Sequence, residues 1–374
     1  MLENKKNKNI MNRRKTISVK VGDIFIGSEY PVRVQTMTNT DTNDIDGSVE
    51  QVKRCVAAGA ELVRFTTQGE KEVDNLALIK QKLVEQGINI PLAADVHFNA
   101  NVAIKAAQVV EKVRINPGNF GKTADELKTK FVEFLNICKK HNTAVRIGVN
   151  HGSLSERIMN RYGDTPEGMV ESCMELLRIC REENFDQIVI SLKASNTILM
   201  INAVRLLVEK MDAEDFHFPL HLGVTEAGDG EDGRIKSAIG IGALLADGIG
   251  DTIRVSLSED PENEIPVAFS ILQAARSRIT KTEYIACPGC GRTLFDLQTT
   301  LQKVKAATSH FVGVKIAVMG CIVNGVGEMA DADFGYVGAG KGRVSLYKGK
   351  ICIERNIPEE HAVDKLLKII RKVP

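Results

Sequence analysis

The chain has 374 residues, of which 43% are hydrophobic and 26% are charged. A chain of this length is expected to form one large domain of about 250 residues and a smaller one, each with its own core. Its 49 Lys and Arg residues nearly balance its 48 Asp and Glu residues, so the formal net charge is +1. This balance gives no electrostatic reason to expect nucleic acid or an anionic membrane as the main partner, and it favours a small ligand.

The first residues of the sequence do not have the pattern of a signal peptide. Residues 1–15 are rich in Lys and Asn and lack the apolar segment of a signal peptide, and no apolar run approaches the ~20 residues of a membrane span. We therefore expect a cytoplasmic protein in which residues 1–14 form a disordered tail. Eight cysteines in such a chain favour free thiols, metal ligation or redox chemistry over a disulfide framework.

From residue 31 to residue 258 one pattern repeats: a short β-branched run, then polar residues, then an amphipathic helical stretch. Eight such runs occur, at 31–36, 62–66, 91–96, 112–116, 144–150, 187–193, 220–226 and 252–257. Eight strand and helix units over about 240 residues are typical of a (β/α)8 TIM barrel, which we assign to residues 15–280. A doubly wound open sheet is the alternative, because one miscounted strand would convert one fold into the other.

The pattern changes after a helical stretch at 262–278. A cysteine pair is followed by a predicted helix at 294–308, a strand at 313–319 and a glycine-rich turn. Two or three short strands between 334 and 353 and a last helix at 359–372 complete the chain. Residues 281–374 are thus expected to form a small α+β domain.

This second domain contains a candidate metal site. Cys287 and Cys290 form a C-x-x-C turn, and Cys321 and Glu328 lie in the glycine-rich turn after a predicted buried strand. Three thiolates favour zinc or an iron–sulfur cluster. An oxygen ligand in the fourth place would be held weakly and could be displaced by a substrate oxygen. A structural zinc site is the alternative; Cys352 lies in an alternating strand pattern that favours a place in the core.

The other four cysteines fall on predicted helices, where buried packing is their expected role: Cys55, Cys138, Cys173 and Cys180.

Basic residues recur in the predicted barrel strands, namely Arg64, Arg114, Arg146, Lys193 and Arg254. A charged residue in a buried strand is costly unless it is paired, so each needs an anion. Internal ion pairs are one explanation, but several cations at one face fit a polyanionic ligand better, because guanidinium groups match phosphate oxygens. Polar residues end strands of the same barrel and offer hydrogen bonds and a candidate acid: Asp95, Asn116, Asn150, Thr225, Glu226 and Ser256. His97 and His221 fit a structural role equally well.

Several long motifs resemble one known family. They lie at 35–40 (QTMTNT), 114–119 (RINPGN), 146–150 (RIGVN), 223–228 (GVTEAG), 250–256 (GDTIRVS), 287–292 (CPGCGR) and 320–325 (GCIVNG). Together they resemble the 4-hydroxy-3-methylbut-2-enyl diphosphate synthase family of the non-mevalonate isoprenoid pathway. The resemblance covers nearly the whole chain from residue 16. It implies a TIM barrel followed by a small domain similar to the ferredoxin-like half-domain of sulfite and nitrite reductases.

The resemblance also implies the chemistry. The family converts 2-C-methyl-D-erythritol 2,4-cyclodiphosphate to the linear allylic diphosphate, with two electrons from reduced flavodoxin or ferredoxin. It implies a [4Fe-4S] cluster on Cys287, Cys290, Cys321 and Glu328, with the barrel cations and Ser256 holding the diphosphate and Glu226 as the proton donor. Val326 stands where the family usually has proline, so the turn before Glu328 is expected to be less rigid.

Two other readings of the residues remain open at this point: a zinc-stabilised barrel transferase of the pterin-binding kind, and an iron–sulfur redox sensor. For the main reading we expect a head-to-tail homodimer. Some family members carry an extra domain between the barrel and the cluster domain, and this chain has no room for one. The segment 279–286 spans at most about 28 Å, which leaves little chain to traverse the height of the barrel and then turn inward over the rim of its own mouth. One subunit's cluster is therefore expected to cover its partner's barrel.

Overall fold

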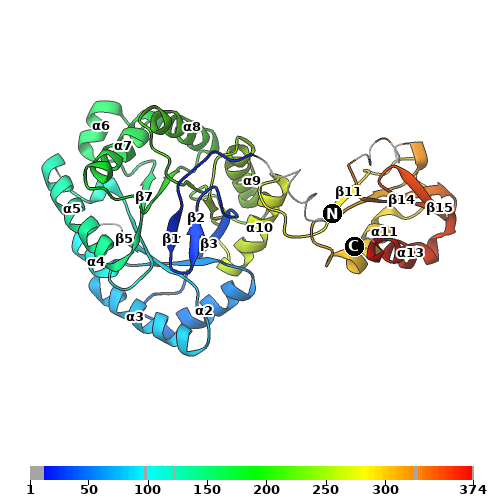
Figure 1. The fold of residues 1–374 in the computed structure, drawn as a ribbon, viewed down its shortest axis with the longest axis horizontal. Coiled ribbons are helices and arrows are strands. Elements are labelled where there is room, and N and C mark those ends of the chain that lie inside the picture. Colours follow the sequence, from blue (N-terminus) through cyan, green and yellow to red (C-terminus); the bar gives the residue numbers. More distant parts are fainter. Residues whose placement is uncertain are drawn as a thin grey trace. The chain divides into compact units, whose positions relative to one another are not determined.

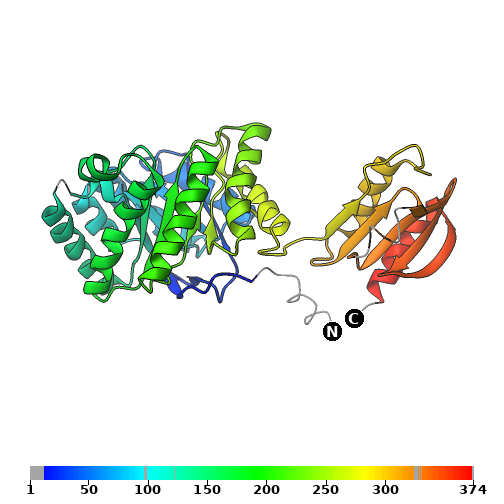
Figure 2. The ribbon, with the colours of Figure 1, turned by 90° about the horizontal axis from the view of Figure 1, so that it is seen from above.

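A computed structural model describes residues 12–96, 99–121, 123–323, 327, 329 and 331–372. The chain divides into two compact units (Figures 1 and 2): a barrel that ends at Arg278 and a C-terminal unit that begins at Ile279.

The first unit is a barrel of eight parallel strands, as the repeating pattern predicts. The strands are β3 (Arg33–Met37), β4 (Leu62–Thr66), β5 (Leu92–Val96), β6 (Lys112–Ile115), β7 (Ala144–Asn150), β8 (Ile188–Lys193), β9 (His221–Leu222) and β10 (Thr252–Ile253). Their order in the sheet is β8-β7-β6-β5-β4-β3-β10-β9. A parallel bridge between Ile190 and Leu220 joins the two ends of this sheet and closes the barrel. The alternative of an open doubly wound sheet is therefore wrong.

Helices surround the strands (Figure 1). They are α2 (Ile45–Ala57), α3 (Glu70–Glu85), α4 (Ala100–Ala106), α5 (Ala124–His141), α7 (Pro166–Glu182), α8 (Thr197–Ala213), α9 (Gly230–Ala246) and α10 (Pro261–Ala274). A short helix, α6 (Glu156–Tyr162), and a 3-10 turn, η2 (Pro117–Asn119), lie in the loops after β7 and β6.

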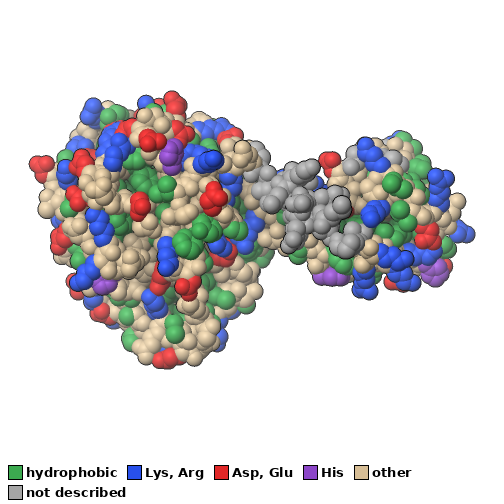
Figure 3. Space-filling model, in the orientation of Figure 1, with side chains coloured by type: hydrophobic (Ala, Val, Ile, Leu, Met, Phe, Trp, Pro, Cys, Tyr) green, Lys and Arg blue, Asp and Glu red, His purple; other side chains and the backbone are tan. Residues whose placement is uncertain are grey.

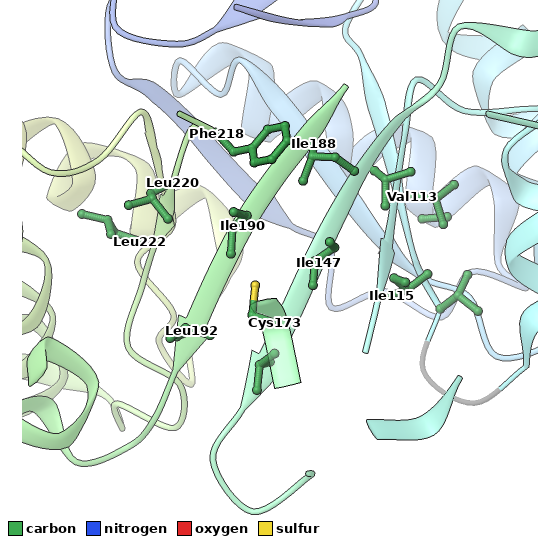
Figure 4. Close-up of a cluster of buried hydrophobic side chains, with 14 of the residues drawn as sticks. Val113, Ile115, Ile147, Cys173, Ile188, Ile190, Leu192, Phe218, Leu220 and Leu222 are labelled. Carbon is green, nitrogen blue, oxygen red and sulfur yellow. The ribbon is translucent and has the colours of Figure 1, made fainter. Parts of the chain in front are cut away.

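The main core lies between the strands and these helices. Alternate residues of the strands, such as Val113, Ile115, Ile147 and Ile190, belong to one buried apolar cluster that includes Cys173 of α7 (Figure 4). Cys55, Cys138 and Cys180 are buried in the same cluster, as predicted. Because side chains alternate along a strand, the intervening residues point to the barrel axis.

An N-terminal hairpin that the sequence reading did not anticipate closes one end of the barrel. Strands β1 (Val19–Val21) and β2 (Ile24–Ile26) pair antiparallel. Val19, Val21 and Ile26 pack against residues near the starts of barrel strands, among them Leu62 and Ala144. The end where the strands begin is thus filled with apolar side chains, which leaves the end where the strands finish as the place for a site.

The disordered tail expected over residues 1–14 does not extend to Arg13 and Arg14, which contact the barrel. Arg13 donates hydrogen bonds to the carbonyl oxygens of Tyr30 and Gly27, at 2.6 and 3.2 Å, and forms an ion pair with the buried Asp251. The backbone N–H of Arg14 donates to the carbonyl oxygen of Gly248 at 2.8 Å. These residues are fixed because their guanidinium groups satisfy carbonyl and carboxylate oxygens at the base of the barrel.

The C-terminal unit is a mixed five-stranded sheet with the order β11-β12-β13-β14-β15. Its elements are β11 (Glu283–Ala286), α11 (Leu297–Thr308), β12 (Lys315–Met319), β13 (Phe334–Gly340), β14 (Arg343–Lys348), β15 (Ile351–Pro358) and α13 (Glu359–Arg371). The first three strands are parallel and the last two are antiparallel to their neighbours. Val304 of α11 and Leu366 of α13 pack with Ile316 and Leu346 of the sheet in one apolar core.

Basic and acidic side chains are interspersed over the face of the barrel drawn in Figure 3, in agreement with the balanced net charge. Among the described residues, no helix combines the length and the apolar character that a membrane span requires.

Candidate functional site

Charged side chains occupy the barrel interior toward the end where the strands finish. In most TIM barrels, apolar side chains occupy the interior. On β6 the inward positions are Lys112 and Arg114, and on β7 they are Arg146 and Gly148. Lys112, Arg114 and Arg146 are each no more than 3% exposed. Buried charges at this density are retained only where ion pairs or a bound anion compensate them.

Asp95 is the central anion of this group. Its Oδ1 accepts a hydrogen bond from Nη1 of Arg114 at 2.9 Å, and its Oδ2 lies 3.5 Å from Nε of Arg64. Burial opposes ionisation of Asp95, but the positive charges of Arg64, Arg114 and Arg146 outweigh it and lower the pKa of the carboxyl. Asp95 is therefore held in its ionised form and anchors two guanidinium groups.

A second anchor, Glu264 of α10, holds Arg254. Its carboxylate lies 3.3 Å from Nη2 of Arg254 and also accepts the backbone N–H of Leu257 at 2.9 Å and the hydroxyl of Thr36 at 3.2 Å. The sulfur of Met37 lies between two arginines, 2.9 Å from Nη2 of Arg64 and 3.4 Å from Nη1 of Arg254. These contacts fix the direction of both guanidinium groups at the mouth of the barrel.

Arg146 and Lys193 are buried beside these pairs. Within the described residues, neither forms an ion pair, and Nε and Nη1 of Arg146 have no hydrogen-bond partner. Burial lowers the pKa of Lys193 well below its usual value, and the charges of Arg146 and Arg64 lower it further. Burial likewise lowers the pKa of Arg64, to about 10, although Asp95 opposes the shift. In both cases burial is the main cause of the lowered pKa, and the charges of neighbouring arginines add to it.

The charge balance indicates the kind of ligand. The cations are Arg64, Lys112, Arg114, Arg146, Lys193 and Arg254, and the carboxylates paired with them among the described residues are Asp95 and Glu264. Guanidinium groups bind phosphate oxygens in pairs, and a ligand with several negative charges would offset the excess. The arrangement fits a polyanion such as a diphosphate.

The polar residues predicted at the strand ends occupy several environments. Asn116 is buried, and its Oδ1 accepts the backbone N–H of Gly118 at 3.1 Å, so its side chain stabilises the turn η2. Asn150, Thr225 and Ser256 are half-buried. Glu226 is exposed, with a backbone φ of 53° in the left-handed region. The structure thus gathers the predicted cations and Asp95 in one cluster, and leaves Glu226 open to solvent.

Two charged residues of this interior were missed from the sequence. Lys112 donates to Oε1 of Gln35 at 2.8 Å inside the barrel. It lies two positions before Arg114, so the period of two along a strand could have placed it on the same face. Glu264 lies on an otherwise apolar face of α10, where a lone acid signals a buried partner.

His221 is 1% exposed, neither ring nitrogen has a partner among the described residues, and burial lowers its pKa well below the usual value.

The three thiols predicted as metal ligands lie on two neighbouring loops of the C-terminal unit. Cys287 directly follows β11, and Cys321 lies two residues after β12, which pairs with β11 in parallel at Ala286 and Val318. The backbone N–H of Gly320 donates to the sulfur of Cys287 at 3.2 Å. Cys290 is exposed and Cys321 is 8% exposed. Cys352, expected in the core, is half-buried at the edge of an apolar cluster on the same unit.

The donor chemistry of these loops fits an iron–sulfur group. Three thiols from two adjacent loops supply the ligands that such clusters take, and a backbone N–H aimed at a sulfur is a contact that stabilises a thiolate ligand. Within the described ranges, no three His, Cys, Asp or Glu side chains are close enough together to form a metal site. Glu328, the predicted fourth ligand, Val326 and His97 lie outside the described residues.

Comparison with known proteins identifies the family. A model described as the GcpE TIM-barrel domain matches residues 16–269, and one described as the GcpE protein C-terminal domain matches residues 283–372. The chain belongs to the GcpE family. Membership in it implies an iron–sulfur cofactor and supports neither the zinc-stabilised transferase nor the redox sensor.

Relatives match over nearly the full length. The 4-hydroxy-3-methylbut-2-en-1-yl diphosphate synthase (ferredoxin) of Synechococcus sp. (strain CC9902) is 52% identical over 380 positions, which cover 97% of this chain and 94% of the relative. The 4-hydroxy-3-methylbut-2-en-1-yl diphosphate synthase (flavodoxin) of Parabacteroides distasonis is 40% identical over 599 positions, which cover 96% of this chain and 98% of the relative. That alignment is longer than this chain, so the relative contains insertions that this chain lacks.

Solved structures match less closely. A dihydropteroate synthase from Yersinia pestis covers 70% of this chain and 100% of its own at 12% identity and a TM-score of 0.47, a likeness that carries no argument about function.

Proposed function

We propose that this chain is an oxidoreductase that forms 4-hydroxy-3-methylbut-2-enyl diphosphate by reductive ring opening and dehydration of 2-C-methyl-D-erythritol 2,4-cyclodiphosphate. The two relatives described above carry the name of this activity and match the chain over nearly all of its length. The observation that supports the substrate class is the barrel interior, which holds five buried cations and the half-buried Arg254, whereas the carboxylates paired with them among the described residues are Asp95 and Glu264.

In this proposal the barrel binds and orients the diphosphate. Arg114 and Arg64 are held by Asp95, and Arg254 is held by Glu264, so their remaining N–H groups are fixed in direction before the substrate arrives. Arg146 and Lys193 supply further positive charge and form no ion pair within the described residues. Asn116, Asn150, Thr225 and Ser256 surround the ends of the strands and add neutral hydrogen-bonding groups at the mouth.

The C-terminal unit would hold the cofactor. We assign it as a [4Fe-4S] cluster on Cys287, Cys290 and Cys321 with Glu328 as the fourth ligand. When bound, the cluster supplies electrons one at a time and assists C–O cleavage as a Lewis acid. The Gly320 N–H that donates to the Cys287 sulfur would stabilise the thiolate in this role.

Loss of water from the substrate needs a proton, and Glu226 is the proposed donor. It lies four residues after β9, on the loop that follows Leu222 at the end of the barrel where the strands finish. Because the side chain is exposed in the free protein, it can recover its proton from solvent after each turnover.

The proposed partners are reduced flavodoxin or ferredoxin, the donors in the names of the relatives, and a second copy of the chain. Arg278 donates to the carbonyl oxygen of Val32 at 2.9 Å, so the chain leaves the barrel at the end where the strands begin. Thr282 already donates to the carbonyl oxygen of Thr308 in the C-terminal unit. Three residues lie between these anchors, so the linker reaches about 14 Å over four Cα-to-Cα steps, whereas a strand of five to seven residues spans roughly 17–23 Å. A head-to-tail dimer, in which each C-terminal unit serves the partner's barrel, avoids this shortfall.

A cytoplasmic location also belongs to the proposal, because thiols bind iron only where they stay reduced.

Mixing two inactive variants tests the shared site. A Glu226→Ala chain and a Cys321→Ser chain, combined under conditions that exchange subunits, would form a dimer in which one site carries both defects and the other carries neither. Activity should return in this mixture. Proven heterodimers without activity would contradict the shared site.

A further inference from the structure

The backbone conformation at position 148 does not require a glycine. It is buried on β7, faces the barrel axis between Arg146 and Asn150, and is not among the residues with a positive φ. A Cβ atom at this position would lie 2.5 Å from Nε of Arg114 and 3.2 Å from its Cγ. The side chain of Arg114 therefore lies flat across the strand that follows its own, in the space that a side chain of residue 148 would occupy.

Gly223 repeats this arrangement two strands further along. It follows β9, is buried, and also lacks a positive φ. A Cβ atom there would lie 2.8 Å from Nζ of Lys193, which belongs to the preceding strand, and 2.6 Å from the carbonyl oxygen of Arg254. In both places an inward glycine makes room for a cation from the strand before it.

From these two sites we infer that Gly148 and Gly223 are positioning residues for the diphosphate site. Most TIM barrels fill this level with bulky branched side chains. Here the missing side chains let Arg114 and Lys193 lie against the barrel wall, beside the other cations of the proposed diphosphate site. The inference rests on the proposed function, because it assigns the phosphate groups to these cations.

Arg114 cannot move aside without a loss. Its Nη1 donates to Asp95 at 2.9 Å and its Nη2 donates to the carbonyl oxygen of Gly148 itself at 2.8 Å. A methyl group at residue 148 pushes against Nε, between these two contacts, and turns the guanidinium toward the axis. The phosphate would then meet a displaced donor, which weakens substrate binding without removing any charge.

The test uses Gly148→Ala, since the atom that a Cβ would meet there belongs to a side chain, whereas at Gly223 it would also meet backbone. Iron-loaded protein is titrated calorimetrically with the cyclic diphosphate and, separately, with inorganic diphosphate. We expect Gly148→Ala to raise both dissociation constants by about tenfold to a hundredfold, the equivalent of one charge-assisted hydrogen bond. Steady-state assays should show the same rise in KM and a smaller change in kcat.

Gly240→Ala is the matched control. A Cβ atom at Gly240 of α9 would lie 2.5 Å from Cγ2 of Val224, so this substitution crowds the core outside the barrel axis. It should lower the melting temperature and leave the dissociation constants unchanged. Equal weakening in both variants would overturn the inference, because general crowding would then account for the effect.

Combination with Arg114→Ala shows whether the glycine acts through the arginine. Once the side chain at 114 is removed, Gly148→Ala should change binding by no more than about twofold. A further loss as large as in the wild-type background would overturn the inference. If Gly148→Ala alone fails to fold, the double variant should fold and bind as Arg114→Ala does, and a double variant that also fails to fold counts against the inference. Wild-type protein that binds neither probe would instead refute the proposed function, whereas Gly148→Ala that binds like wild type refutes the inference alone.

Discussion

Nη1 of Arg114 lies 2.9 Å from Oδ1 of Asp95 in the barrel interior, where both side chains are less than one-tenth exposed. The same carboxylate faces Arg64 at 3.5 Å, so one buried anion holds two guanidinium groups. Removal of one member of a buried pair costs more than the pair contributes, because it leaves a charge uncompensated.

Asp95→Asn should therefore lower the free energy of unfolding by about 3–5 kcal/mol in ligand-free protein. A bound diphosphate would supply the missing negative charge, so the rise in melting temperature on adding diphosphate should be larger in the variant than in the wild type. Thermal melts with and without diphosphate measure both effects. Asp46→Asn, which breaks an exposed pair with Lys82, is the control and should change stability by at most about 0.5 kcal/mol. A variant as stable as the control would show that Asp95 does not anchor the arginines.

Lys193 should make substrate binding depend on pH. Burial and the neighbouring arginines lower the pKa of Lys193 well below its usual value. A diphosphate binds the charged ammonium form of Lys193, so its affinity is full below this lowered pKa and falls as the pH rises through it. When the diphosphate binds protein in which Lys193 is neutral, the amine takes up a proton. In Lys193→Arg the side chain stays charged to higher pH, so the fall should move upward. Lys210→Arg on the surface of α8 should keep the wild-type profile. The same midpoint in Lys193→Arg would assign the titration to another group.

Iron content separates the ligand thiols from the others. Cys287→Ser, Cys290→Ser and Cys321→Ser should each lose the broad visible absorption and most of the iron, which is about four atoms per chain in a [4Fe-4S] protein. Cys352→Ser should keep both, since Cys352 lies on β15 at the far edge of the sheet from β11. Full iron in the Cys290→Ser protein would remove that residue from the ligand set. Glu328→Gln is expected to keep most of its iron but to lose turnover.

Glu226→Gln should lower kcat more than it raises KM. The amide keeps the size of the side chain but cannot donate the proton that leaves with water, so the loss appears in the transition state. Rates and KM values measured under anaerobic conditions test this. Glu231→Gln, in the first turn of α9, offers a nearby exposed carboxylate as the control. An unchanged kcat in Glu226→Gln would exclude Glu226 as the donor.

The sequence predicted the features that repeat. Alternation and turn spacing placed all eight barrel strands, because β-branched runs such as 144–150 are buried on both faces in a parallel barrel. The hairpin β1–β2 was missed because two strands of three residues carry too little pattern, and its partners, among them Leu62 and Ala144, are distant in sequence.

The candidate site was predictable only in part, for a similar reason. The arginines are visible because a cation within a strand is unusual, but their pairing depends on which strands become neighbours. Glu264 is separated from Thr36 by 228 positions, so no local pattern links them. The space that Gly148 leaves for Arg114 likewise depends on the conformation of the Arg114 side chain, which crosses the neighbouring strand.

The central claim is that the reaction is reductive and acts on a cyclic diphosphate. The most direct measurement is the number of electrons consumed for each molecule of 4-hydroxy-3-methylbut-2-enyl diphosphate formed, with anaerobic iron-loaded protein, the cyclodiphosphate and a reduced flavodoxin or ferredoxin in limiting amounts. The account predicts that two electrons are consumed for each product molecule and that no product forms without the reductant. Product formed at the same rate without a reductant, or oxidation of the donor without any product, would contradict it.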